Sequence, residues 1–324
     1  FNTADMVRRA AGTPVRVASK SIRSRSLISS LLAVPGFSGV LAYSLPEALW
    51  LAETMDDIVI GYPSTDRIAI AQLGRSEMAA ARVTLMIDSV DHLDLIDSVC
   101  APGQRAVLRI AIDVDAAWNA PRPLGHVGVY RSPSSAPGQA GALARHIEHR
   151  DGFTLVGLMA YESQIAGVAD GVPGRGAAVG NLIRRWMKRR SGTELRERRA
   201  RIVDAVSRVR PLEFVNGGGT GSLEWTATDP SVTEIGAGSG LLAGHYFDGF
   251  EQFTPAPASG FGLRVARQPE PNMVTVSGGG WTASGPPGRD RLPAPVWPEG
   301  LSFVPREMAG EVQTPLRGEA ARQM

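Results

Sequence analysis

The chain has 324 residues, of which 43% are hydrophobic and 20% charged, a composition typical of a globular protein with a sizeable core and not of a disordered or fibrous one. Its formal net charge is only +2, and no basic stripe is interleaved with aromatic residues, so we expect no nucleic-acid partner. The longest uncharged stretch, residues 26–46, is interrupted by proline, glycine and serine, which argues against a membrane span.

Strand-like and helical patterns alternate along the chain up to residue 235. The predicted strands are residues 15–20, 39–43, 57–62, 83–88, 107–115, 154–161, 212–215 and 232–235. Apolar residues at helical spacing lie between them, at residues 22–34, 44–52, 66–74, 91–99, 137–149 and 178–210. Eight strand signals separated mostly by helices are typical of a (β/α)8 barrel, the TIM barrel. The sequence therefore predicts an α/β fold of this class.

The composition changes beyond Phe250. Prolines and a glycine run at residues 278–280 separate short β-like segments there, a pattern that favours loops and short strands over helices. We therefore predict a barrel domain at residues 1–250, followed by a smaller β-rich C-terminal domain at residues 251–324 that is expected to be incomplete.

Two glycine-rich runs follow the last two predicted strands of the barrel. Residues 216–222 read Asn-Gly-Gly-Gly-Thr-Gly-Ser, and residues 236–240 read Gly-Ala-Gly-Ser-Gly. Glycine lets the backbone approach a ligand closely and turn its N–H groups toward an anion. The loops after strands seven and eight are also where TIM barrels most often bind phosphate. We therefore predict a phosphate-binding cradle formed by Gly218, Gly219, Thr220, Gly221, Gly238 and Ser239.

Only two of the 34 basic residues are lysines, Lys20 and Lys188. A lysine amine, unlike a guanidinium, can lose its proton and form an imine with an aldehyde. Lys20 ends the first predicted strand, which in a closed barrel is the neighbour of the eighth. Its expected position beside the cradle suits pyridoxal 5′-phosphate (PLP) as cofactor. Lys188 belongs to a basic helical run, residues 184–190, which we interpret as a solvated helix face without chemistry.

Three segments carry a resemblance to a known family. They are residues 13–21 (Thr-Pro-Val-Arg-Val-Ala-Ser-Lys-Ser), residues 217–221 (Gly-Gly-Gly-Thr-Gly) and residues 233–239 (Thr-Glu-Ile-Gly-Ala-Gly-Ser). They resemble the alanine-racemase-type, fold type III PLP enzymes, and most closely the D-threonine aldolase and D-serine dehydratase-like branch of amino acid deaminases and aldolases. The resemblance implies a barrel like the N-terminal domain of alanine racemase, a Schiff base on Lys20, and Tyr161 lining the cofactor. Tyr161 is equally compatible with a packing role at the barrel mouth.

The chain departs from this branch in two places. The branch often has Arg-x-Gly-Val after strand five, whereas this chain has His126-Val-Gly-Val; His126 could supply the polar contact to the cofactor ring instead. Metal-dependent members take their ligands from a His-containing segment near the C-terminus, which this sequence does not reach, so a divalent metal is expected only in a longer chain. His245 and Asp248 are not spaced as metal ligands, and we expect no metal on them.

Lysine, cradle and resemblance together predict a PLP-dependent lyase of the aldolase or deaminase type. Its expected substrate and partner is a small, D-configured β-hydroxy amino acid, and a homodimer is compatible with the fold type. A racemase on the same fold, a non-catalytic PLP-binding protein and a cofactor-free sugar-phosphate aldolase are the alternatives. A racemase would need a second base, and no tyrosine follows Tyr246. A single cysteine, Cys100, and the lack of a secretory signal favour the cytoplasm.

Overall fold

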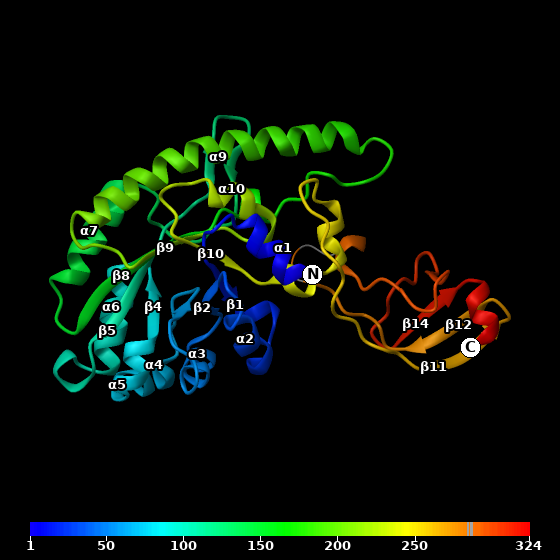
Figure 1. Ribbon diagram of the computed structural model, residues 1–324, viewed down its shortest axis with the longest axis horizontal. Coiled ribbons are helices and arrows are strands. Elements are labelled where there is room, and N and C mark those ends of the chain that lie inside the picture. The colour runs from blue at the N-terminus through cyan, green and yellow to red at the C-terminus, as the bar shows by residue number, and fades with distance from the viewer. Residues whose placement is uncertain (284, 286–287) are drawn as a thin grey trace. The chain divides into compact units, whose positions relative to one another are not determined.

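The computed structural model describes residues 1–283, 285 and 288–324 (Figure 1). These residues form two compact units. The first comprises Phe1–Leu242 and Phe250–Ala256, and the second comprises Ala243–Gly249 and Pro257–Met324. Among the residues described, no helix combines the length and the apolar character that crossing a bilayer requires.

Within residues 1–283, which the structure describes without a gap, eight parallel strands close into a barrel in the order β1-β10-β9-β8-β5-β4-β3-β2. The strands are β1 (Val15–Ala18), β2 (Phe37–Ala42), β3 (Ile58–Ile60), β4 (Val83–Ile87), β5 (Leu108–Asp113), β8 (Phe153–Ala160), β9 (Phe214–Gly217) and β10 (Glu234–Ala237). The predicted (β/α)8 barrel is confirmed. Between β5 and the next helix the chain forms a small antiparallel hairpin, β6 (Trp118–Ala120) and β7 (Gly125–Val127).

Helices connect the strands and cover the outside of the barrel (Figure 1). They are α1 (Asn2–Arg9), α2 (Arg25–Leu32), α3 (Leu45–Ala52), α4 (Arg67–Arg75), α5 (Glu77–Arg82), α6 (Val90–Val99), α7 (Pro137–Glu148), α8 (Ser163–Ala166), α9 (Ala177–Ser207), α10 (Leu223–Ala227) and α11 (Ser239–Leu242). Local sequence fixes several of their starts. Ser44 caps α3, for example, by accepting a hydrogen bond from the backbone N–H of Glu47, as the Ser-x-x-Glu pattern predicts.

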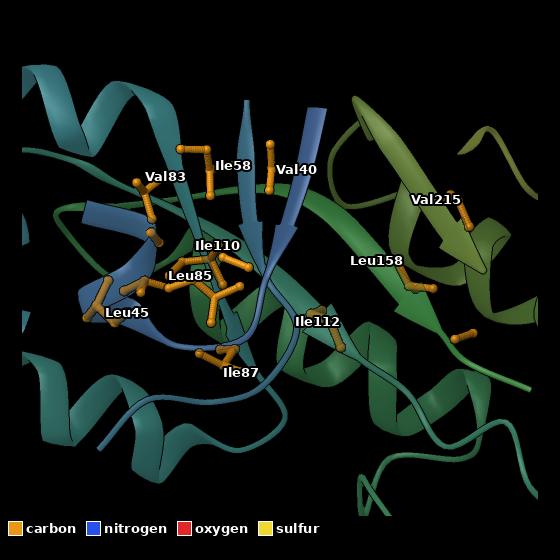
Figure 2. Packing of buried hydrophobic residues seen from close by; sticks show 14 of the residues in the cluster. Val40, Leu45, Ile58, Val83, Leu85, Ile87, Ile110, Ile112, Leu158 and Val215 are labelled. Carbon is orange, nitrogen blue, oxygen red and sulfur yellow. The ribbon is translucent and has the colours of Figure 1, made fainter. Parts of the chain in front are cut away.

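Alternation along the strands divides the core into two layers. One set of side chains, including Val40, Ile58, Leu85, Ile110 and Leu158, packs with helix residues such as Leu45 (Figure 2). The intervening residues form a separate buried cluster of Val59, Met86, Ala111, Val156, Met159 and Phe214. Because successive side chains on a strand point to opposite faces, this second cluster fills the inside of the barrel.

A buried network of charges closes the N-terminal end of the barrel. Arg16 in β1 donates to both carboxylate oxygens of Glu234 at 2.6 Å and to those of Asp57 at 3.0 Å. Asn216 also donates to Glu234, at 2.8 Å. Arg16 is only 2% exposed, so its charge needs these partners. The network lies at the end of the barrel that in TIM barrels serves stability, whereas active sites lie at the opposite end. Losing one of its partners would leave a buried charge unpaired and destabilise the fold.

The last two strands lie two residues further along the chain than predicted. The pattern indicated strands at residues 212–215 and 232–235, whereas β9 is Phe214–Gly217 and β10 is Glu234–Ala237. Gly217 pairs with Ala160 of β8 and with Ile235 of β10. The neighbouring strands therefore hold the first glycines of each run in the ladder, where propensity alone predicts a loop.

The second unit contains a four-stranded antiparallel sheet of order β11-β12-β14-β13. Its strands are β11 (Val265–Glu270), β12 (Met273–Ser277), β13 (Ser302–Phe303) and β14 (Gln313–Arg317). Val274, Val276, Leu301, Leu316 and Ala321 form its small buried core. The β-rich character predicted for the C-terminal region is confirmed.

Candidate functional site

Lys20 lies directly after β1, in the 3-10 turn η1 (Ser19–Ser21), and its side chain is exposed. A hydrogen bond between Ser19 and Glu47 holds the backbone of this turn. Ser19 is fully buried and donates its hydroxyl to Glu47 at 2.7 Å, and the same carboxylate accepts from the backbone N–H of Tyr43 at 3.1 Å. The backbone that carries the predicted catalytic amine is thus held by Glu47 in the first turn of α3.

The two glycine-rich loops contact each other. Thr220 Oγ1 lies 3.1 Å from Ser239 Oγ and accepts a hydrogen bond from the backbone N–H of Gly240 at 3.0 Å. A Cβ on Gly238 would lie 2.5 Å from the carbonyl oxygen of Ala18, so only glycine fits where the second loop passes the end of β1. The structure therefore brings the predicted cradle residues together, next to the strand that leads to Lys20.

Tyr161 stands between the first glycine-rich loop and the interior of the barrel mouth. It lies two residues beyond Met159, which belongs to the inner cluster, so strand alternation directs its ring into the opening. A Cβ on Gly219 would lie 3.3 Å from Tyr161 Cε2 and 3.0 Å from the Cβ of Ala166. Tyr161 therefore lies beside the first glycine-rich loop, and its contact with the cofactor stays a prediction.

An ion pair that the sequence did not indicate lies at the mouth of the barrel, beyond the ends of β3 and β5. Arg131 donates to Asp113 Oδ2 at 2.9 Å and to the carbonyl oxygen of Gly61 at 2.9 Å. Its guanidinium lies 4.9 Å from the ring centre of Tyr62 and 5.9 Å from that of Tyr161. Gly61 follows β3, four places from β9 in the barrel order, and Asp113 ends β5, two places from β9. The pair therefore places a cation at the mouth, near the ring of Tyr161.

Asp113 is the acidic member of this pair and is 2% exposed. Burial raises its pKa to about 6, against the opposing attraction of Arg131. Its Oδ1 is buried and has no hydrogen-bond partner among the described residues. A carboxyl group at the end of a barrel strand is a signal that sequence reasoning could have used. Arg131 gives no such signal, since the β6–β7 hairpin separates it from the strand.

His126 lies in that hairpin and stacks on Tyr130 with the ring centres 4.0 Å apart. Tyr130 is 84% exposed, whereas His126 is half-buried and its Nε2 is buried without a hydrogen-bond partner among the described residues. Arg131, one residue beyond Tyr130, supplies the cationic group in the mouth. The contact of His126 with the cofactor ring stays a prediction.

The interpretation of residues 184–190 as a solvated face is wrong for Lys188. Its side chain is buried, its Nζ lies 2.9 Å from Asp170 Oδ2, and the ring of Phe250 is 4.9 Å away. Burial lowers the pKa of Lys188, and the bond to Asp170 opposes that shift. Arg189 and Arg190, next to it in α9, are exposed as expected. A one-residue exception of this kind arises because Asp170, from a separate loop, reaches the helix.

His245 and Asp248 lie in the second unit, in the 3-10 helix η4 (His245–Gly249), where the imidazole Nε2 of His245 is 2.5 Å from the carbonyl oxygen of Leu292. In the part of the chain that the structure describes, no group of three or more His, Cys, Asp or Glu side chains is placed to hold a metal ion.

Comparison with known proteins places this geometry among related folds. No protein-family model and no curated protein matches the chain. D-threonine aldolase from Filomicrobium marinum matches with a TM-score of 0.72 and 16% identity, over 99% of this chain and 79% of the aldolase. D-threo-3-hydroxyaspartate dehydratase from Delftia sp. HT23 matches with a TM-score of 0.69 and 18% identity, over 99% and 81%. The chain has the alanine-racemase-type fold.

Alanine racemase itself, from E. faecalis, matches with a TM-score of 0.56 and 15% identity, over 98% of this chain and 82% of the racemase. The resemblance indicated by the three motifs is confirmed at the level of this fold. The barrel and the β-rich region of the alanine-racemase-type fold are both present, and the glycine-rich loops lie at the barrel end where that architecture carries its chemistry.

Proposed function

We propose that the chain is a PLP-dependent lyase of the aldolase or deaminase type, acting on a small, D-configured β-hydroxy amino acid through Lys20. The observation that carries the proposal is the contact of both glycine-rich loops with each other and with the end of β1, through Thr220, Ser239 and Gly238. Two hydroxyls, closely spaced glycines and a lysine beyond the adjoining strand form the donor set that a phosphorylated aldehyde needs.

The residues fit the cofactor in three places. Thr220 and Ser239 would donate hydroxyl hydrogens to its phosphate, the Lys20 amine would bind its aldehyde carbon, and Tyr161 would line one side of the ring. Arg131, held by Asp113 at the mouth, would face an anionic oxygen of the cofactor or the substrate. When bound, the pyridoxal ring supplies an electron sink for a bond broken at the substrate Cα or between Cα and Cβ.

Lys20 has a second task in this proposal. When it does not hold the cofactor, the Lys20 amine would be available to take or return a proton on the β1 side of the mouth. Removal of the β-hydroxyl proton would lead to cleavage of the Cα–Cβ bond and release of an aldehyde. Removal of the Cα proton and departure of the hydroxyl as water would leave an enamine, which a second water molecule hydrolyses to a keto acid and ammonia. Both outcomes need a base on only one side of the cofactor, whereas a racemase needs a second base on the other.

Spectroscopy of the full chain with PLP tests the proposal. We expect a visible-range absorbance that borohydride reduction fixes covalently on Lys20, and we expect cleavage of a D-configured β-hydroxy amino acid in a panel of D- and L-amino acids. Lys20→Ala should abolish both. A Lys20→Ala protein that keeps the absorbance and the activity would reject the assignment. Formation of both enantiomers from one would favour a racemase, and a bound cofactor without turnover of any amino acid would favour a PLP-binding protein.

A further inference from the structure

A fully buried carboxylate lies beneath the glycine-rich loop after β9. Glu162 directly follows Tyr161 and has no exposed surface. Its Oε2 accepts a hydrogen bond from the backbone N–H of Gly218 at 3.0 Å. Its Oε1 accepts from Thr226 Oγ1 at 2.5 Å and from Ser222 Oγ at 3.4 Å. One carboxylate thus binds the beginning, the middle and the end of the segment that contains the predicted cradle.

Arg199 of α9 makes this burial tolerable. It donates to Glu162 Oε2 at 2.7 Å and to Asp229 Oδ2 at 2.8 Å, and the side chains of all three residues are 0% exposed. A buried carboxylate without a partner would be strongly destabilising. Arg199 supplies the opposite charge, while Gly218, Ser222 and Thr226 supply the remaining hydrogen bonds to the carboxylate.

The contact with Gly218 decides which groups the loop can offer to an anion. Gly218 has a φ of +77°, and a Cβ there would lie 2.6 Å from Ile235 Cγ2, so its peptide is held in a conformation that suits glycine. Since the N–H of Gly218 is bound to Glu162, it is not a donor to a ligand. The next donors are the Thr220 hydroxyl and the N–H groups of Thr220 and Gly221 at the start of the 3-10 helix η3 (Thr220–Ser222).

The loop is held at a second point from the outside. Arg9 of α1, which is 4% exposed, donates to the carbonyl oxygen of Thr220 at 2.7 Å. A carboxylate therefore holds an N–H at the start of the loop, and a guanidinium holds a carbonyl two residues later. Fixing both peptides orients the N–H groups of Thr220 and Gly221 without using them, whereas the N–H of Gly219 donates to Ser222 Oγ at 3.2 Å.

From these contacts we infer that Glu162 is a positioning residue, which orients the loop after β9 so that it binds the phosphate of the cofactor. The inference rests on the proposed function and assigns a role to a side chain that does not itself touch the ligand. A preorganised loop binds an anion better than one that must order on binding. The effect of Glu162 should therefore fall on the phosphate and not on the aldehyde of the cofactor.

Comparison of PLP with pyridoxal, which has the aldehyde but no phosphate, separates these two effects. The measurement is the dissociation constant of each compound, by absorbance titration, for the wild type and three variants. Glu162→Gln keeps the shape of the side chain but removes its charge. We expect it to reduce the preference for PLP over pyridoxal about tenfold, which corresponds to about 1.4 kcal/mol, while pyridoxal binding stays within about twofold of wild type.

Thr226→Val is the milder variant, because it removes one hydrogen bond to the carboxylate at nearly constant volume. We expect a loss of preference of about threefold, and this variant decides the question if Glu162→Gln does not fold. Glu234→Gln is the matched control, since Glu234 is also a buried carboxylate paired with a buried arginine, Arg16. It should lower the stability but leave the preference for PLP unchanged.

The two levels of the proposal fail in different ways. A wild-type chain that binds PLP no better than pyridoxal would contradict the phosphate cradle and with it the proposed function. A wild-type preference that persists undiminished in Glu162→Gln, or in Thr226→Val if the former does not fold, would contradict the role of Glu162 alone. Equal losses of preference in Glu162→Gln and Glu234→Gln would also contradict it, because general destabilisation would then explain the result.

Discussion

Replacing Gly238 by alanine tests the close passage of the second glycine-rich loop beside β1. The new Cβ would lie 2.5 Å from the carbonyl oxygen of Ala18 and 3.1 Å from its Cβ. The oxygen belongs to the backbone of β1, which is paired on both sides in the barrel, so it has little room to yield. Overpacking of this kind costs about 1–3 kcal/mol. We expect the upper part of that range, about 2–3 kcal/mol, because a backbone atom and not a flexible side chain must move.

Urea unfolding followed by tryptophan fluorescence measures this loss. With a slope of about 2–3 kcal/mol per M, the midpoint should fall by about 1 M. Gly138→Ala is the matched control, because nothing lies within 4 Å of a Cβ at this position in α7. Alanine is the better helix former, so this variant should gain up to about 0.5–1 kcal/mol. If Gly238→Ala unfolds at the same urea concentration as wild type, the tight passage of the loop beside β1 is refuted.

Three further predictions concern single side chains. Burial raises the pKa of Asp113 from 3.8 to about 6, so the folded chain binds this proton more tightly than the unfolded chain, and the free energy of unfolding should fall as the pH rises from about 4 to 6. Asp113→Asn should remove up to about 3 kcal/mol of that fall. If urea unfolding shows the same pH dependence of the free energy of unfolding in Asp113→Asn as in wild type, the raised pKa is contradicted. Lys188→Met leaves Asp170 buried without its cation and should lower the free energy of unfolding by about 3 kcal/mol in the same assay. Arg190→Met changes an exposed side chain and should keep the free energy of unfolding within about 0.5 kcal/mol of wild type. Equal losses in the two variants would refute the buried pair. After borohydride treatment with PLP, mass spectrometry of the wild type should find a covalent adduct on Lys20, and Lys20→Arg, which keeps the charge but cannot form an imine, should lose it. An adduct on Lys188 and none on Lys20 in the wild type would disprove the assigned chemistry.

The sequence carried the parts of the site that depend on neighbours along the chain. The two glycine-rich runs and Lys20 each follow a strand directly, so the order of strands sufficed to place them at one end of a barrel. The ends of β9 and β10 could not be predicted to the residue, because Gly217 is kept in the ladder by pairing with Ala160 and Ile235. That pairing depends on strands distant in the sequence.

The supporting side chains could not be predicted, because tertiary packing alone brings them together. Arg131 is separated from Asp113 by a hairpin, and Arg199 reaches Glu162 from the far part of a 31-residue helix. The same cause explains the exception at Lys188. Its sequence neighbourhood predicts a surface cation, and only the folded chain brings Asp170 beside it. Charges that neutralise each other across long sequence separations leave no periodic pattern to detect.

The filled interior of the barrel has a kinetic consequence. Apolar side chains such as Met86 and Phe214 fill its middle, and the ion pair between Arg16 and Glu234 plugs the far end. Small molecules therefore have no passage through the barrel, so under the proposed function the substrate would enter and the products would leave at the same end. A product that leaves slowly would block the next substrate, so product release would limit turnover. Added product should then inhibit competitively with the substrate.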